Sequence, residues 1–137
     1  MKAQLGLEYI VILTVVIALI TPLFYLANQR LEVSRVTSEA RLAVDEIVTS
    51  VNTVYAQTPG SKLTSNIFVP NGYENQTSYI ANKTISMKFK LADGRDYEIS
   101  GLPRCNVSGR LPPYAGYHVM TFILNQNGIV LINTTAT

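Results

Sequence analysis

The sequence predicts an α+β protein, in which a long N-terminal helix packs on a C-terminal head that is an antiparallel β-sheet or a small Ig-like β-sandwich. Three observations lead to this prediction. The chain opens with a nearly uncharged apolar segment, continues with apolar residues every three or four positions, and then changes to period-two alternation. The change follows Pro59 and Gly60, a pair that ends helices and forms turns.

These patterns divide the 137 residues into four parts. Residues 1–3 are a short leader, and residues 4–29 form a hydrophobic helix for a membrane or a filament core. Residues 30–57 continue this helix in amphipathic form. Residues 58–137 form the β-rich globular head.

The apolar segment is long enough to cross a bilayer. Residues 9–29 carry no charged side chain over 21 positions, which corresponds to about 31 Å of α-helix. Pro22 predicts a bend late in this run. An ordinary secretory signal peptide fits poorly, because its apolar core is usually about 7–15 residues long and is followed by a cleavage pattern of small residues. A plain single-pass anchor fits the hydropathy but leaves Glu8, the acid at its head, unexplained.

The amphipathic part predicts that the helix continues without a break to about Ala56. Opposite charges four residues apart pair Arg35 with Glu39 and Arg41 with Asp45, on faces that we interpret as solvated. The apolar residues form a single stripe, which we expect to cover one open face of the head. The stripe consists of Val33, Val36, Ala40, Ala43, Val44, Ile47, Val51 and Val54.

The head is expected to contain six short strands separated by turn residues. Alternation is clearest in residues 78–91, where Ile85, Met87 and Phe89 share one face, and in residues 117–126, which are apolar on both faces. The expected strands are 65–70, 78–91, 96–100, a short strand within 106–116, 117–126 and 129–133.

Charge and side-chain chemistry argue against several functions. A net charge of +2 with scattered basic residues gives no support for nucleic-acid binding. Cys105 is the single cysteine, so no intrachain disulfide can form, and we interpret it as a small buried hydrophobe. His118, the single histidine, lies inside an expected strand and is interpreted as a packing residue. We therefore expect no enzyme, no catalytic residue, no cofactor and no metal site.

The first residues offer an explanation for Glu8. They read KAQLGLEYIVIL and resemble the class III signal peptide of archaeal type IV pilin-like proteins. In that family a short basic leader ends in a small residue, and a membrane peptidase cuts before a Gln. The resemblance therefore implies cleavage between Ala3 and Gln4, with Glu8 as the fifth residue of the mature chain and Tyr9 opening the apolar run.

The resemblance also implies that Gln4, Glu8 and Tyr9 act in filament assembly. Cleavage would free an α-amine on Gln4, one helical turn from Glu8. That amine, or the amine of a neighbouring subunit, would neutralise a carboxylate that is very unfavourable alone in an apolar core. The acid would then fix the axial register between helices.

As a pilin, the chain would be made as a precursor in the cell membrane and cut by a prepilin peptidase. An assembly ATPase and a membrane platform protein would extract it, and it would polymerise with copies of itself into an extracellular filament whose usual activity is adhesion. The alternative is a single-pass membrane-anchored β-domain that binds a partner at the cell surface and never polymerises.

Four Asn-x-Ser/Thr sequons lie in the head and none in the helix. Four sequons confined to the candidate external part predict an N-glycosylated extracytoplasmic surface. Their asparagines are Asn75, Asn82, Asn106 and Asn133. The first lies in residues 71–79, a stretch with Tyr73 and Tyr79 that fits an adhesive loop and a sheet rim equally well.

Overall fold

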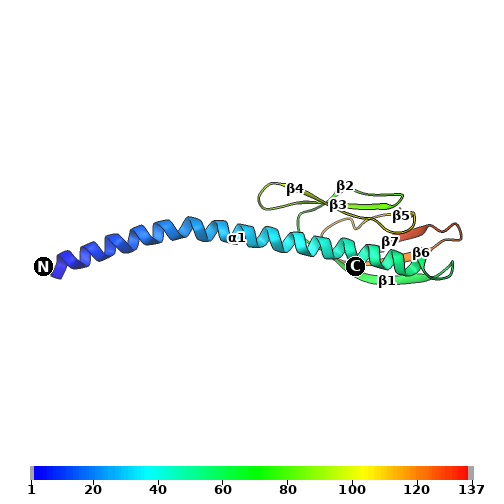
Figure 1. Ribbon diagram of the computed structural model, residues 1–137, viewed down its shortest axis with the longest axis horizontal. Helices are drawn as coiled ribbons and strands as arrows, with labels where there is room; N and C mark the ends of the chain where they lie inside the picture. Colours follow the sequence, from blue (N-terminus) through cyan, green and yellow to red (C-terminus); the bar gives the residue numbers. More distant parts are fainter. Residues whose placement is uncertain (1, 136–137) are drawn as a thin grey trace.

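The computed structural model describes residues 2–135, except for the side chain of Lys2. One helix, α1 (Lys2–Tyr55), precedes seven strands (Figure 1). The strands are β1 (Lys62–Val69), β2 (Tyr73–Ala81), β3 (Thr84–Lys90), β4 (Asp96–Gly101), β5 (Val107–Gly109), β6 (Gly116–Leu124) and β7 (Val130–Thr135). The predicted α+β class, with one long N-terminal helix followed by a β-rich head, is confirmed.

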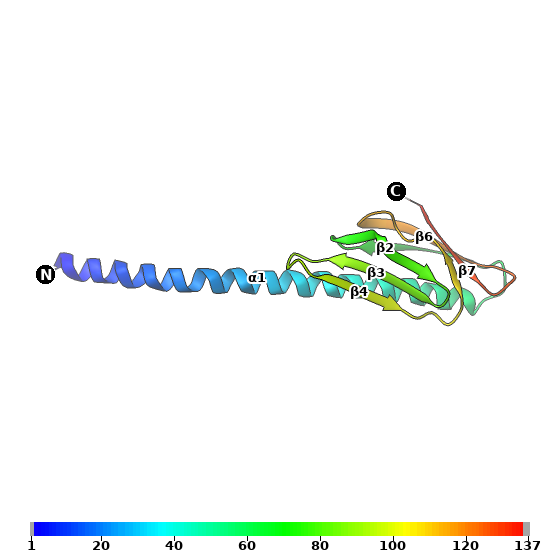
Figure 2. The same cartoon turned by 90° about the horizontal axis from the view of Figure 1, so that it is seen from above.

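Helix α1 has 54 residues, and its N-terminal half extends well beyond the head (Figures 1 and 2). The helix continues through Pro22, and in Figure 1 it follows a gentle arc instead of a sharp bend. Pro22 lacks the N–H that would bond one turn back. The Thr21 hydroxyl donates a hydrogen bond to the Ile17 carbonyl oxygen at 2.7 Å, and the Thr14 hydroxyl donates one to the Ile10 carbonyl oxygen at 2.8 Å. Such side-chain hydrogen bonds to the preceding turn also favour gentle curvature of a helix.

The strands form two sheets. One has the order β1-β6-β7-β5 and the other the order β2-β3-β4. Neighbouring strands are antiparallel except β5 and β7, which pair in parallel with Val107 opposite Val130. The expected antiparallel pairing is therefore found in every strand pair of the described residues except this one. The three-residue β5 enters the sheet beside the last strand, so tertiary position and not a local hairpin sets its direction.

The expected strand 78–91 is in fact a hairpin, which raises the number of strands from six to seven. Strands β2 and β3 meet at a two-residue turn, Asn82 and Lys83, where Asn82 has φ +47°. Asparagine tolerates this left-handed conformation better than most residues. Ile80 pairs with Ile85 across the turn. Apolar residues therefore stand on both sides of the turn, which is why the alternation looked unbroken.

The position of the helix also differs from the expectation that it covers one sheet face. Helix α1 contacts β1 and β4, the edge strands of the two sheets, and reaches β6 and β3 behind them. On the opposite side of the head, edge strands β2 and β5 contact each other. Figure 1 shows the C-terminal half of the helix with β4 on one side and β1 on the other. The two sheets share one core, and the helix closes it along the β1 and β4 edges.

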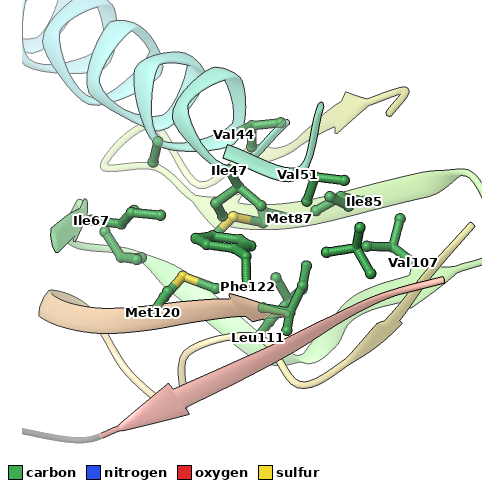
Figure 3. Close-up of a cluster of buried hydrophobic side chains, with 14 of the residues drawn as sticks. Val44, Ile47, Val51, Ile67, Ile85, Met87, Val107, Leu111, Met120 and Phe122 are labelled. Carbon is green, nitrogen blue, oxygen red and sulfur yellow. The ribbon is translucent and has the colours of Figure 1, made fainter. Parts of the chain in front are cut away.

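Figure 3 shows this shared core, with Ile47 and Val51 of α1 facing Met87 of β3 and Phe122 of β6. All four side chains are at most 1% exposed. Burying an aliphatic side chain of this size stabilises the fold by about 1.5–3 kcal/mol. The predicted stripe is confirmed. Its buried members are Ala40, Ala43, Val44, Ile47, Val51 and Val54, and Val33 and Val36 are half-buried.

Close packing and polar contacts fix the helix on the head. A Cβ atom at Gly101 of β4 would overlap the side chains of Val48 and Val44, so the glycine permits the close approach of strand and helix. On the other sheet, Ser65 of β1 donates a hydrogen bond to Glu46 at 2.8 Å. Contacts to both edges therefore hold the C-terminal half of α1 in one orientation.

Candidate functional site

The N-terminal half of α1 presents apolar side chains to solvent on every side. Leu7, Ile10 and Phe24 are 63–67% exposed, and the most apolar 18-residue window of the helix has a mean hydropathy of 2.7 with none of it buried. The exposure follows from the fold, because the head begins to bury the helix only near Val33. By length and composition this segment could span a membrane, and it is compatible with membrane anchoring.

The predicted assembly residues lie on the first turns of this exposed segment. Ala3 and Gln4, which would flank the cleaved bond, are already helical, and Gln4 and Glu8 are one turn apart. Glu8 and Tyr9 are exposed. Glu8 takes part in none of the ion pairs among residues 3–135. Gln4 and Glu8 therefore lie on one side of α1, in the exposed part of the helix that the head does not bury.

All four sequon asparagines are exposed, and they lie in or next to strands β2, β5 and β7. Asn82 occupies the β2–β3 turn, and its carbonyl accepts a hydrogen bond from the Val107 N–H at 2.6 Å, which places it beside Asn106. Asn75 lies in β2 and Asn133 in β7. We call this part of the head, formed by β2, β5 and the adjoining part of β7, the sequon edge.

A groove of about 530 Å³ runs along the sequon edge. Asn75 and Tyr79 line it from β2, Asn133 lines it from β7, and Arg110 and Leu111 line it from the segment after β5. Its volume is within the usual range for small-molecule sites. Sequence patterns gave no sign of this groove, because its lining residues come together only when β2 packs beside β5.

The residues that we interpreted as packing residues are buried. His118 is fully buried, its Nε2 lies 2.8 Å from the Tyr114 carbonyl oxygen, and its ring stands edge-on to the Tyr114 ring. Cys105 is 4% exposed, and burial raises the pKa of its thiol, which disfavours the reactive thiolate. The two interpretations are confirmed. Among the described residues, no three metal-ligating side chains are grouped so that they could hold an ion.

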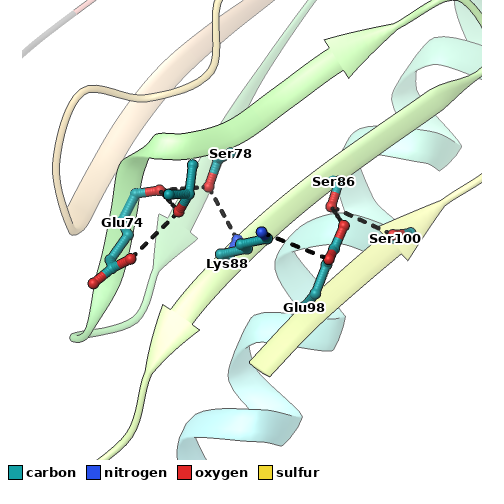
Figure 4. Close-up of polar contacts among 7 residues, drawn as sticks. Glu74, Ser78, Ser86, Lys88, Glu98 and Ser100 are labelled. Carbon is teal, nitrogen blue, oxygen red and sulfur yellow. Dashed lines mark hydrogen bonds and ion pairs between the residues drawn. The ribbon is translucent and has the colours of Figure 1, made fainter. Parts of the chain in front are cut away.

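The outer face of the three-stranded sheet carries a polar cluster that the sequence analysis did not predict. The Ser86 hydroxyl donates to Glu98, whose other oxygen lies 3.9 Å from Lys88 Nζ, and Ser100 donates to Ser86 (Figure 4). These residues are cross-strand neighbours in the β3–β4 hairpin. Counting outward from the Asp93–Gly94 turn would have predicted their pairing. The cluster satisfies the buried Ser86 hydroxyl, and we assign it a structural role.

The ion pairs on the helix agree in part with expectation. Arg35 Nε lies 2.8 Å from Glu39 Oε1, whereas Arg41 and Asp45 are not among the ion pairs of the described residues. Surface pairs of this kind contribute little to stability.

Comparison with known proteins identifies no relative. No protein-family model matches the chain, and no curated protein and no solved structure shows significant similarity to it.

Proposed function

We propose that this chain is a structural subunit of a pilus-like surface filament, polymerised through its N-terminal helix. The observation that carries the proposal is the apolar half of α1, which lies outside the head and is exposed around its whole circumference. A surface of this size needs a cover. A bilayer would supply it before assembly, and the same helix of other copies would supply it in a filament.

Glu8 supports polymerisation over simple anchoring. A carboxylate at the head of an apolar helix costs several kcal/mol when it is buried without a partner. Cleavage between Ala3 and Gln4 by a prepilin peptidase would create a cationic α-amine one helical turn away. Pairing of Glu8 with the amine of a neighbouring subunit would allow only one axial offset between subunits, whereas pairing within its own chain would neutralise the acid without setting that offset. An assembly ATPase and a platform protein are the further partners that the resemblance implies.

In such a filament the helices would lie at the centre and the heads outside. Strands β2 and β5 of the sequon edge are at the sheet edges opposite to those that α1 contacts. Glycans on the exposed side chains of Asn75, Asn82, Asn106 and Asn133 would leave the apolar half of the helix free to pack. Adhesion would then be mediated by the outer surface of the heads. The precursor would reside in the cell membrane and the mature subunit in an extracellular filament.

The second candidate is a membrane-anchored β-domain that does not polymerise. The same exposed helix favours it, since a single span also covers the apolar surface. Mass determination of the mature N-terminus separates the two candidates. A chain that begins at Gln4 supports the filament subunit, and a chain that retains residues 1–3 supports the anchored domain.

Substitution of Glu8 tests the role of this acid in assembly. We expect Glu8→Ala to leave membrane insertion intact and to abolish filaments, because the registering charge is lost while the apolar helix remains. The matched control is Glu32→Ala, which removes an exposed acid from the same helix outside the apolar segment. Electron microscopy of sheared surface material measures the yield. Filaments of wild-type abundance from the Glu8 variant would refute the role.

Glycosylation is tested at the sequon of Asn75. We expect Thr77→Ala to remove the glycan from Asn75, whereas Thr77→Ser keeps both the sequon and the glycan, because either hydroxyl completes the triplet. Mass spectrometry of glycopeptides from the native cell reports occupancy. An unmodified Asn75 in the wild-type protein would remove this residue from the proposal.

A further inference from the structure

The position of the apolar segment fixes the level at which a membrane surface would meet the protein. Residues 9–29 are uncharged and span about 31 Å, close to the thickness of the hydrocarbon core. The headgroup layer adds about 5–7 Å on each side, which corresponds to about four further residues of helix. The headgroup layer on the side of the head would therefore lie around residues 30–34 of α1.

The β3–β4 hairpin reaches the helix at this level. A groove of about 330 Å³ is lined by Leu26, Gln29 and Arg30 of α1 and by Asp93, Arg95 and Tyr97 of the hairpin. Figure 2 shows the hairpin lying along the helix, with its turn directed toward the N-terminal half. The end of the head nearest this part of α1, which we call the base of the head, is therefore formed by the hairpin together with the β1–β2 turn, where Asn71 and Gly72 line a second groove with Glu32.

The groove has the chemistry of a lipid site. Leu26 belongs to the apolar segment, whereas Arg30 and Arg95 bring two guanidinium groups to the level of the headgroups. The Arg95 side chain is 77% exposed, and its Nε lies 4.0 Å from an oxygen of Asp93. Arg30 is in none of the ion pairs of the described residues. Guanidinium groups bind phosphate in bidentate fashion, and tyrosines such as Tyr97 favour the interface between lipid and water.

Acidic side chains at the same level of the helix restrict the attraction for anionic lipid headgroups to the neighbourhood of the arginines. Glu32 lies on α1 and Asp93 at the hairpin turn, so the base of the head is not uniformly positive. The two arginines on either side of the groove are the groups that complement an anionic headgroup.

We propose that this groove, between residues 26–34 of α1 and the β3–β4 hairpin, binds the headgroup of an anionic phospholipid and seats the head on the membrane surface. Leu26 contacts the upper acyl chain, and Arg30 and Arg95 hold the phosphate. The inference depends on insertion of α1 into a membrane, which the proposed filament subunit and the anchored domain share, and it goes beyond both. Extraction of a subunit from the membrane would then have to break this contact.

Site-specific quenching in vesicles tests the proposal. The full chain, with its single cysteine removed by Cys105→Ala, is labelled with a fluorophore at one new cysteine and reconstituted into vesicles of phosphatidylcholine with phosphatidylglycerol. Ala92→Cys labels the exposed hairpin, Asn127→Cys labels the exposed turn at the far end of the head, and Ile17→Cys labels the apolar helix. Lipids spin-labelled on the headgroup or on the acyl chain serve as quenchers.

We expect the headgroup label to quench position 92 strongly and position 127 weakly, and the acyl-chain label to quench position 17. If positions 92 and 127 are quenched equally while position 17 is quenched, the helix inserts and the seating of the head is refuted. If position 17 is not quenched by the acyl-chain label, insertion fails, and this proposal fails with it.

Charge variants test the lipid specificity. Arg30→Gln and Arg95→Gln should each weaken the contact of the hairpin with phosphatidylglycerol vesicles by about fivefold. The matched controls are Arg104→Gln and Arg110→Gln, which remove exposed arginines from other parts of the head. Quenching at position 92 that is the same with and without phosphatidylglycerol, or that falls equally in the controls, would overturn the assignment to an anionic headgroup.

Discussion

At the scale of the residue, Gly109 is a position that both the backbone conformation and a neighbouring strand restrict to glycine. Its φ is +140°, and a Cβ atom there would overlap the carbonyl oxygen of Ile132 in the neighbouring strand β7. We expect Gly109→Ala to lower the free energy of unfolding by about 2–4 kcal/mol, because it adds a backbone clash to left-handed strain. Urea denaturation of the full chain in detergent, followed by the near-UV circular dichroism of its tyrosines, measures the loss.

Gly94 provides the control for this prediction. It also has a positive φ, of +78°, but nothing lies within 4 Å of an added Cβ atom. Gly94→Ala should therefore cost only the conformational term, about 1–2 kcal/mol. Equal losses in the two variants would contradict the role of the contact with Ile132.

Single residues also differ in how far the sequence could predict them. Cys105 was predicted to be a packing residue because it is the single cysteine, and His118 because it lies inside an expected strand; both are buried. The hydrogen bond from the buried Ser86 hydroxyl to Glu98 could be predicted from the register of the β3–β4 hairpin. The Asp93–Gly94 turn indicates that register in the sequence. The close approach at Gly109 could not be predicted, because it depends on a parallel pairing between strands that are distant in the chain.

At the scale of the element, helices and strands with a long, regular apolar period were predicted correctly, and those with a short or interrupted period were not. The apolar stripe of α1 repeats over six turns, and both the extent of the helix and its buried face were predicted. The β2–β3 hairpin was read as one strand because Ile80 and Ile85 flank a turn that lacks glycine and proline. The placement of α1 along the edges of two sheets required knowledge of how the sheets face each other, which no local pattern contains.

The docking of α1 on β4 can be tested at Gly101. A Cβ atom there would meet the side chains of Val48 and Val44, which can shift only partly. We expect Gly101→Ala to lower the free energy of unfolding by about 1–3 kcal/mol, the usual cost of overpacking. Val48→Ala in the same chain should recover part of that loss, since it removes the methyl groups nearest to the new atom. A double-mutant cycle measures the coupling, and strictly additive losses would contradict this packing.

At the scale of the whole molecule, the chain combines a packed head with a helix segment that the head does not need. Every residue of the hydrophobic core lies at or after Ala40, and the apolar helix before Leu31 adds no buried side chain. The candidate assembly residues at the N-terminus were predicted from a contiguous motif. The sequon edge and the groove at the base of the head were not, because each gathers residues from separate elements.

This separation predicts that the head folds without the apolar segment. A chain that begins at Arg30 should be soluble without detergent and should keep its near-UV circular dichroism, with a free energy of unfolding within about 0.5 kcal/mol of the full chain. A chain that begins at Glu46 loses Ala40, Ala43 and Val44, each at most 3% exposed, and should be less stable by about 3–5 kcal/mol. Size-exclusion chromatography and urea denaturation measure both. Aggregation of the longer fragment would mean that residues 1–29 support the head, and the exposed helix would then need another explanation than assembly or anchoring.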